Sequence, residues 1–170
     1  AESSAMYAPG KIIRSGGSDP SITKTATIDM TAANPQWKPV QPMNFPRRRH
    51  NMVILADGQV MAVGGTRRAD DVGDPLTLPG AVYEGEIWNP ATEQWVVTAP
   101  MAVDRMYHSS AVLLPDGRVL TAGGEYSGRY TAQLFSPPYL FKGARPVINA
   151  APSTAGYGAA LPIDVGITDG

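Results

Sequence analysis

Short apolar segments separated by Gly, Pro, Asn and Asp follow one another along most of the chain. Four of them form two neighbouring pairs, and each pair flanks an Asp-Gly dipeptide. Asp-Gly between apolar segments is typical of a β-hairpin with a type I′ turn, because both central residues of that turn take positive φ. The pattern therefore predicts two hairpins of strands covered on both faces. Their strands are segments 51–56 with 59–63 and 109–114 with 118–122.

A shorter motif recurs three times along the chain. In each copy a glycine precedes a Gly-Gly pair by six positions, with a β-branched residue two positions after the first glycine. The copies are segments 10–17, 58–65 and 117–124. We expect Gly-Gly to close the second strand of each hairpin, where a positive φ or a close backbone approach excludes a side chain.

A longer repeat overlaps this one. The pattern Q-W-x4-P-M-x3-R-x2-H occurs twice, with every position offset by 58 residues. Its two copies are Gln36, Trp37, Pro42, Met43, Arg47 and His50, and then Gln94, Trp95, Pro100, Met101, Arg105 and His108. A further strand is expected to end near Trp88. The unit thus has about four strands, and the Trp of the last strand offers an apolar face for packing against the next unit.

Four-stranded units with Gly-Gly and Trp at fixed places are typical of kelch-type β-propeller blades. The expected fold is all-β: a propeller segment of about two to three blades at 1–144, with a loop insertion at 66–80. Propellers close with about 4–8 blades, so the rest of the same propeller or other chains would complete the ring. Apolar alternation near the end of the chain predicts a separate β-sandwich that begins at about Arg145 and occupies 145–170.

The composition excludes several classes of site. The chain has no Cys, so it contains no disulfide, thiolate metal site or cysteine nucleophile. Its net charge of -1 argues against nucleic-acid binding. No apolar segment is long enough to span a bilayer, and the first residues do not resemble a signal peptide. The arginines at 47–49 and 67–68 are offset by Asp70, Asp71 and Asp74, which favours a solvated face.

Residues that depart from their own repeat are the better candidates for a functional site. Arg and His recur in both copies, which favours a scaffold role: Arg binding carbonyl oxygens between strands, and His50 bound to a buried partner. Tyr107 departs, because the first copy has Arg49 at that position. On a regular strand Tyr107 and His108 would point to opposite faces, so they bind one ion only where the chain bends.

A phenol and an imidazole suit Cu(II), which takes tetragonal nitrogen and oxygen ligands. Two ligands are too few for a complete site, so the others would come from elsewhere. From these two residues alone, a packed tyrosine beside a structural histidine is the favoured interpretation.

The segment from Asp104 to Gly124, with its R-x-Y-H-S motif and hairpin, resembles the galactose oxidase and glyoxal oxidase family of copper radical oxidases. That family has a kelch propeller followed by an immunoglobulin-like C-terminal domain. The resemblance implies that Tyr107 is the axial copper tyrosine and the catalytic base, and that His108 is an equatorial copper ligand. It implies that Tyr83 lines the substrate pocket.

The resemblance also implies oxidation of a primary alcohol, an aldehyde or a carbohydrate by O₂, which is reduced to H₂O₂. The copper would supply one of the two redox equivalents, and a tyrosyl radical linked to cysteine would supply the other. That Tyr-Cys cofactor would lie before residue 1 and a second histidine after residue 170, so these residues alone are not expected to be active. Family members of this kind act outside the cell or at its surface. The segment 18–21 differs from the galactose oxidase pocket, so sugar specificity is not implied.

A non-catalytic kelch propeller remains the alternative. It would bind glycan or protein through its loops, or serve as a cell-surface scaffold. A Cys and a Tyr upstream together with a His downstream would favour the enzyme.

Overall fold

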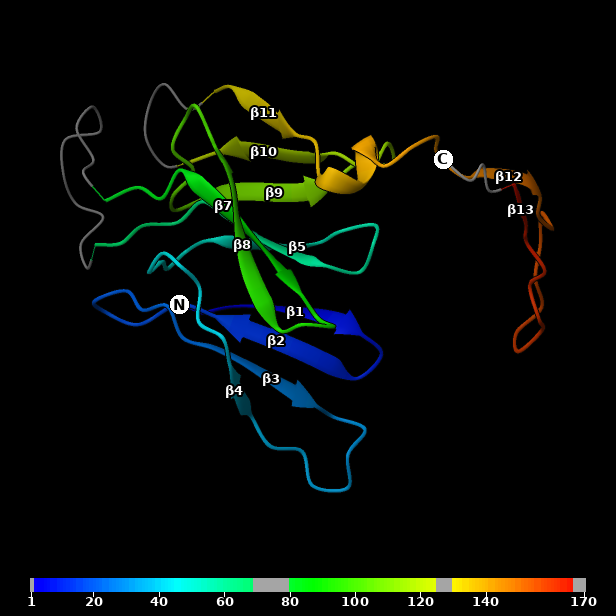
Figure 1. Cartoon of the computed structure of the whole chain (residues 1–170), viewed down its shortest axis with the longest axis horizontal. Helices are drawn as coiled ribbons and strands as arrows, with labels where there is room; N and C mark the ends of the chain where they lie inside the picture. The colour runs from blue at the N-terminus through cyan, green and yellow to red at the C-terminus, as the bar shows by residue number, and fades with distance from the viewer. Residues whose placement is uncertain (1, 69–79, 125–129, 167–170) are drawn as a thin grey trace. The chain divides into compact units, whose positions relative to one another are not determined.

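The computed structural model describes residues 2–68, 80–124 and 130–166 (Figure 1). The chain divides into two compact units, Ala1–Ser136 and Pro137–Gly170. β-Strands are the main regular elements of the described residues, which contain no α-helix. The expected all-β class is confirmed.

The first unit consists of three antiparallel meanders, which we call blades A, B and C. Blade A has strand order β1-β2-β3-β4, blade B has β5-β6-β7-β8, and three described strands of blade C have the order β11-β10-β9. Each blade's first strand contacts that of the next, β1 with β5 and β5 with β9. This arrangement confirms the predicted propeller segment. The strands are β1 Ser3–Ala8, β2 Lys11–Ser15, β3 Thr25–Asp29, β4 Lys38–Val40, β5 Asn51–Ile54, β6 Val60–Val63, β7 Glu84–Asn89, β8 Gln94–Pro100, β9 Ser109–Leu113, β10 Val119–Gly123 and β11 Ala132–Phe135.

Both predicted hairpins are present, but their turn type is not the predicted one. The Gly58 N–H donates to Leu55 O at 3.0 Å, and Gly58 takes a φ of 80°. Asp57 does not take a positive φ, as a type I′ turn would require. A turn followed by a left-handed glycine is the geometry of a longer hairpin loop with a bulge. The loop around Gly117, with a φ of 84°, closes in the same way.

The Gly-Gly pairs close their strands as predicted. Gly64 and Gly65 take φ values of 75° and 89°, in the left-handed region that side chains disfavour. A Cβ atom on Gly64 would also lie 2.2 Å from the carbonyl oxygen of Arg105. Positive φ and close backbone approach therefore both exclude a side chain there, and the close approach joins blade B to the segment entering blade C.

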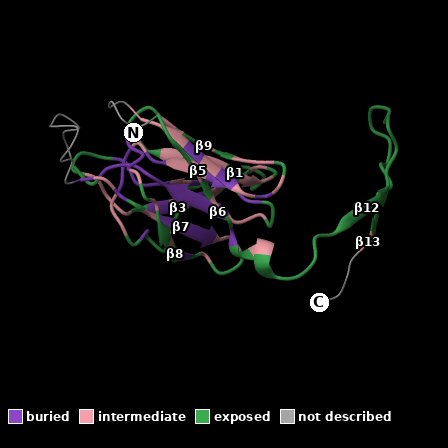
Figure 2. Cartoon of the chain, turned by 90° about the horizontal axis from the view of Figure 1, so that it is seen from above, coloured by how far each residue is buried: buried purple, intermediate pink, exposed green. Residues whose placement is uncertain are grey.

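The core lies between blades A and B, and β6 and β7 are buried along most of their length (Figure 2). Trp88 of β7 is fully buried and faces Trp95 across the β7–β8 pair. Trp95 donates its indole N–H to Thr25 Oγ1 at 3.2 Å, and Tyr7 of blade A packs edge-on against Trp88 at 5.0 Å. Apolar burial of this kind is the main favourable contribution to packing one blade on the next.

The second unit is small and exposed. It contains the 3₁₀ helix η1 at Pro138–Phe141 and one antiparallel pair, β12 at Val147–Ala150 with β13 at Asp164–Gly166. Both strands are exposed along nearly their whole length (Figure 2). The boundary near Arg145 and the immunoglobulin-like sandwich stay predictions. Among the helices described, none has the length and apolar character needed to cross a bilayer.

Candidate functional site

The repeated arginines form the scaffold beneath the candidate site. Arg47 is fully buried and donates to the carbonyl oxygens of Gly64 and Glu84 at 3.0 and 3.1 Å. Arg105 occupies the same repeat position one blade later, and it donates to the carbonyl oxygen of Gly123 at 2.9 Å. Each guanidinium thus fastens the segment that enters a blade to the strands of that blade, as the repeat predicted.

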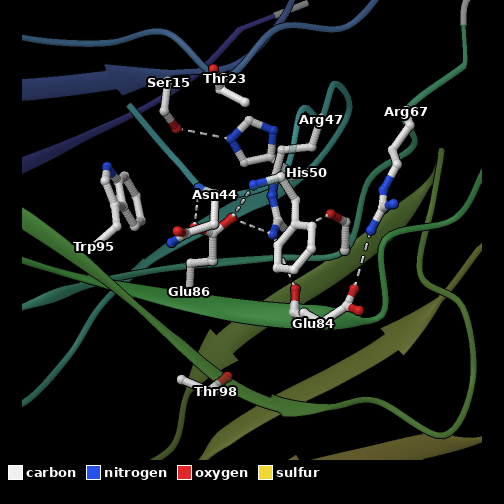
Figure 3. Close-up of polar contacts among 12 residues, drawn as sticks. Ser15, Thr23, Asn44, Arg47, His50, Arg67, Glu84, Glu86, Trp95 and Thr98 are labelled. Atoms are coloured by element: carbon white, nitrogen blue, oxygen red, sulfur yellow. Dashed lines mark hydrogen bonds and ion pairs between the residues drawn. The ribbon is translucent and has the colours of Figure 1, made fainter. Parts of the chain in front are cut away.

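Glu86 is a buried carboxylate that the sequence analysis missed. Its Oε1 atom lies 2.8 Å from Nη2 of Arg47, and both side chains are inaccessible to solvent. The backbone N–H groups of Asn44 and Phe45 donate to the same carboxylate at 2.6 and 3.2 Å (Figure 3). Burial lowers the pKa of Arg47, and the charge of Glu86 opposes that shift. The pair fixes the loop that leads to His50.

A comparison of blades B and C could have pointed to Glu86 as a hydrogen-bond acceptor. In blade C the position equivalent to Glu86 is Gln133, because Ala62 pairs with Glu86 and Thr121 pairs with Gln133. Gln133 Oε1 accepts the N–H of Ala102 at 2.9 Å. In blades B and C, a long polar side chain on the third strand therefore binds the loop entering that blade; blade A has Ala26 at the equivalent position.

His50 is structural. Its side chain is buried, and its Nε2 lies 3.1 Å from Oγ of Ser15 (Figure 3). Burial, reinforced by the charge of Arg47, lowers the pKa of His50 to about 3, so the imidazole is neutral at physiological pH. The scaffold role expected for this histidine agrees with its contacts.

The arginine cluster is only in part the solvated face that the sequence favoured, because Arg67 and Arg68 are exposed while two other arginines are buried. Arg47 and Arg48 are 0% and 8% exposed, and Arg48 pairs with Asp19 at 3.3 Å. The Arg47 guanidinium satisfies carbonyl and carboxylate oxygens that burial would otherwise leave unpaired, whereas the carboxylate of Asp19 that pairs with Arg48 is itself exposed. The aspartates expected to offset them, Asp70, Asp71 and Asp74, lie outside the described residues.

Tyr107 and His108 occupy a turn immediately before β9. The Ser109 N–H donates to Met106 O at 3.2 Å, which closes a β-turn over the pair. His108 takes a φ of 60°, so the chain bends where a strand would send the two side chains to opposite faces. Their rings are instead stacked, with centroids 3.8 Å apart and planes inclined by 27°. Both side chains are exposed.

The two copies of the repeat differ by one position in their backbone. In the first copy the left-handed residue is Arg49, with a φ of 57°, and His50 points into the core. In the second copy the left-handed residue is His108 itself. This shift explains how one motif gives a buried histidine in blade B and an exposed one beside Tyr107 in blade C.

The side chains of Tyr107 and His108 offer ligand atoms of the types that copper binds. A phenol oxygen and an imidazole nitrogen on the same side of the chain are ligands that Cu(II) accepts. Within the described ranges, His, Cys, Asp and Glu side chains form no group of three that could hold a metal ion. The pair could therefore supply part of a site, with the remaining ligands from elsewhere.

Tyr83 and a hollow in blade A are two further features of the first unit. Tyr83 lies directly before β7 and is 38% exposed, and its carbonyl oxygen accepts the N–H of Met101, directly after β8, at 2.8 Å. Its role in a substrate pocket stays a prediction. A hollow of about 390 Å³ in blade A includes Ser15 and Thr25 but neither Tyr107 nor His108.

The fold and the site together define a kelch-type propeller segment with an exposed tyrosine–histidine pair at the entry to a blade. The family model described as Glyoxal oxidase N-terminus matches residues 3–139. The chain belongs to this family.

Individual relatives agree with the family match. Galactose oxidase of Gibberella zeae is 35% identical over 146 residues, which cover 78% of this chain and 21% of that protein. Aldehyde oxidase GLOX of Vitis pseudoreticulata is 30% identical, over 94% of this chain and 33% of that protein. A solved structure of a fungal alcohol oxidase in complex with copper is 27% identical with a TM-score of 0.77, over 88% of this chain and 35% of that one. The chain thus spans about a fifth to a third of these relatives.

Proposed function

We propose that the intact protein is a copper radical oxidase and that Tyr107 and His108 are two of its copper ligands. The observation that supports this most directly is the turn at Met106–Ser109, which stacks the two rings on one side of the chain. The chain also belongs to the glyoxal oxidase N-terminus family, and a relative of this chain is named as an aldehyde oxidase. The alcohol oxidase of similar fold is in complex with copper.

The proposed reaction transfers two electrons and two protons from the substrate to O₂. A primary alcohol RCH₂OH and O₂ give RCHO and H₂O₂, and an aldehyde with water and O₂ gives RCOOH and H₂O₂. When bound, copper would supply one of the two redox equivalents. The phenol oxygen of Tyr107 would accept the proton of the substrate hydroxyl, as a general base must. His108 would hold the metal through an imidazole nitrogen, and Tyr83 would line the substrate pocket.

The rest of the site would come from outside these 170 residues. The chain has no Cys, so a Tyr-Cys radical cofactor requires another part of the intact protein. The substrate is proposed only by class, as a small primary alcohol, aldehyde or carbohydrate. Action outside the cell or at its surface is part of the same proposal.

The test combines metal content, peroxide production and one ligand variant. The intact protein is loaded with Cu(II), dialysed, and assayed for bound copper and for H₂O₂ formed from a panel of primary alcohols and aldehydes. His108→Asn removes the imidazole, while Asn tolerates the left-handed backbone at this position. Tyr130→Phe is the control, because Tyr130 is 90% exposed and away from the pair in sequence.

We expect about one copper per molecule and peroxide from at least one substrate class. In His108→Asn, copper affinity falls by more than about 100-fold, beyond the effect of losing a supporting group. Tyr130→Phe behaves as the unaltered protein. A protein that retains no copper after loading would instead favour the non-catalytic kelch scaffold.

A further inference from the structure

The side chain of Arg49 lies against the ring of Tyr107. Its Cζ atom is 4.1 Å from the centre of the phenol ring. The imidazole of His108 is stacked on the same ring at 3.8 Å. Two groups at these separations cannot share one face of a ring, because each fills the layer next to it. The phenol of Tyr107 therefore lies between a guanidinium and an imidazole.

Arg49 is used differently from the two arginines before it. Arg47 and Arg48 are buried and bound to groups within the propeller. Arg49 is half-buried, and its φ of 57° is a conformation that non-glycine residues adopt rarely. Uncommon backbone conformations of this kind concentrate at functional sites. The backbone thus turns at the residue whose side chain reaches Tyr107.

Arg49 and Tyr107 occupy the same repeat position in consecutive blades. The strands that follow them, β5 and β9, are in contact, which brings equivalent positions of the two blades close together. The two side chains that break the repeat therefore meet each other. The arginines that both copies share, Arg47 and Arg105, serve the scaffold instead.

We infer that Arg49 is a positioning residue for the Tyr107–His108 pair. A tyrosine side chain that is 38% exposed has room to change rotamer. The guanidinium on one face and the imidazole on the other confine the ring, so the phenol oxygen stays beside His108 before a metal arrives. This inference rests on the proposed function.

Because Arg49 is positively charged, a role in charge and a role in positioning predict opposite changes in copper affinity when the side chain is removed. A guanidinium close to a metal site repels Cu(II), so a role in charge alone predicts tighter copper binding when Arg49 is removed. A positioning role predicts weaker binding. The sign of the change in copper affinity separates the two.

The test compares three variants of the intact protein with the unaltered protein. Arg49→Gly removes the side chain and accepts the left-handed backbone without strain. Arg49→Lys keeps the charge and loses the planar guanidinium. The control Arg14→Thr removes a similar contact elsewhere, because Cζ of Arg14 lies 4.2 Å from the ring of Trp37. Each variant is titrated with Cu(II) by calorimetry. Near-ultraviolet circular dichroism is recorded without metal, using Tyr107→Phe to identify the Tyr107 signal.

We expect Arg49→Gly to weaken copper binding by about 2- to 30-fold, the equivalent of about 0.5–2 kcal/mol for a cation–π contact. The Tyr107 dichroism without metal should fall, Arg49→Lys should recover part of both losses, and Arg14→Thr should change neither. Equal or tighter copper binding in Arg49→Gly overturns the positioning role, as does an unchanged Tyr107 signal. If the unaltered protein binds no copper, the proposed function fails, and that result is distinct from either of these.

Discussion

Replacing Glu86 by Gln removes the carboxylate that is ion-paired with Arg47 while keeping the size of the side chain. The two groups form an ion pair at 2.8 Å with both side chains inaccessible to solvent. The Arg47 guanidinium would remain buried, with the carbonyl oxygens of Gly64 and Glu84 as partners. Neutral carbonyl groups compensate a buried charge less completely than a carboxylate does.

The expected cost follows from this burial. Breaking a buried ion pair by removing one partner costs about 3–5 kcal/mol, because the other charge is left uncompensated. The amide oxygen of Gln can still accept the N–H groups that now bind Glu86, as Gln133 accepts the N–H of Ala102 one blade later. We therefore expect Glu86→Gln to lower the free energy of unfolding by about 3 kcal/mol, the lower end of that range.

The assay is urea unfolding followed by tryptophan fluorescence, since Trp88 and Trp95 lie in the core. The matched control is Glu93→Gln, which breaks the Lys38–Glu93 ion pair at 2.9 Å between partly exposed side chains. An exposed pair contributes about 0.2–1 kcal/mol. If Glu86→Gln and Glu93→Gln cost the same within about 0.5 kcal/mol, the argument from burial is refuted.

Two further predictions concern backbone conformation and protonation. Gly64→Ala and Gly58→Ala both place a side chain at positive φ, at about 1 kcal/mol each. Only Gly64→Ala brings a Cβ to 2.2 Å from a carbonyl oxygen, while Gly58 has open space, so denaturant melts should show Gly64→Ala costlier by about 1–3 kcal/mol. For His50, the folded pKa of about 3 lies below the unfolded value of 6.5, so the unfolded state alone takes up a proton between them. Stability is therefore full above pH 6.5 and falls by about 1.4 kcal/mol per pH unit below it, a slope that comparing urea midpoints at pH 7 and 5 should find reduced in His50→Gln. Equal costs for the two glycine variants, or an unchanged slope in His50→Gln, would contradict these assignments.

The repeats predicted the blades because the repeated arginines and glycines perform the same local task in each copy, although the repeated histidines do not. Arg47 and Arg105 both fasten the entry of a blade, and Gly64 stands where a neighbouring carbonyl leaves no room for a Cβ. Such tasks recur with the sequence and can be recognised from spacing alone. The class of fold and the scaffold role of these arginines were predictable for that reason.

The site could be predicted only in part. The departure of Tyr107 from the repeat and the need for a bend were visible in the sequence, but the one-residue shift of the left-handed position was not. In each copy either of two neighbouring residues can take positive φ, Arg49 or His50 in the first and Tyr107 or His108 in the second, and tertiary packing decides which one does. The type I′ turn at Asp57-Gly58 was mispredicted for a related reason, since Asp-Gly suits more than one hairpin loop.

Long-range polar partners were the least predictable features. Arg48 is buried through its pairing with Asp19, which lies 29 residues earlier in the chain. The contact of Arg49 with Tyr107 joins two blades. Nothing in the local sequence distinguishes these arginines from a solvated cluster, because charge runs are buried only when the fold supplies their partners.

The optical spectrum of the copper-loaded intact protein tests the central claim most directly. A phenolate bound to Cu(II) produces a charge-transfer absorption band that a packed, unliganded tyrosine does not. If Tyr107 is a ligand, Tyr107→Phe shifts or abolishes a band that Tyr130→Phe leaves in place. Identical copper spectra for the unaltered protein and for Tyr107→Phe would show that this phenol does not bind the metal.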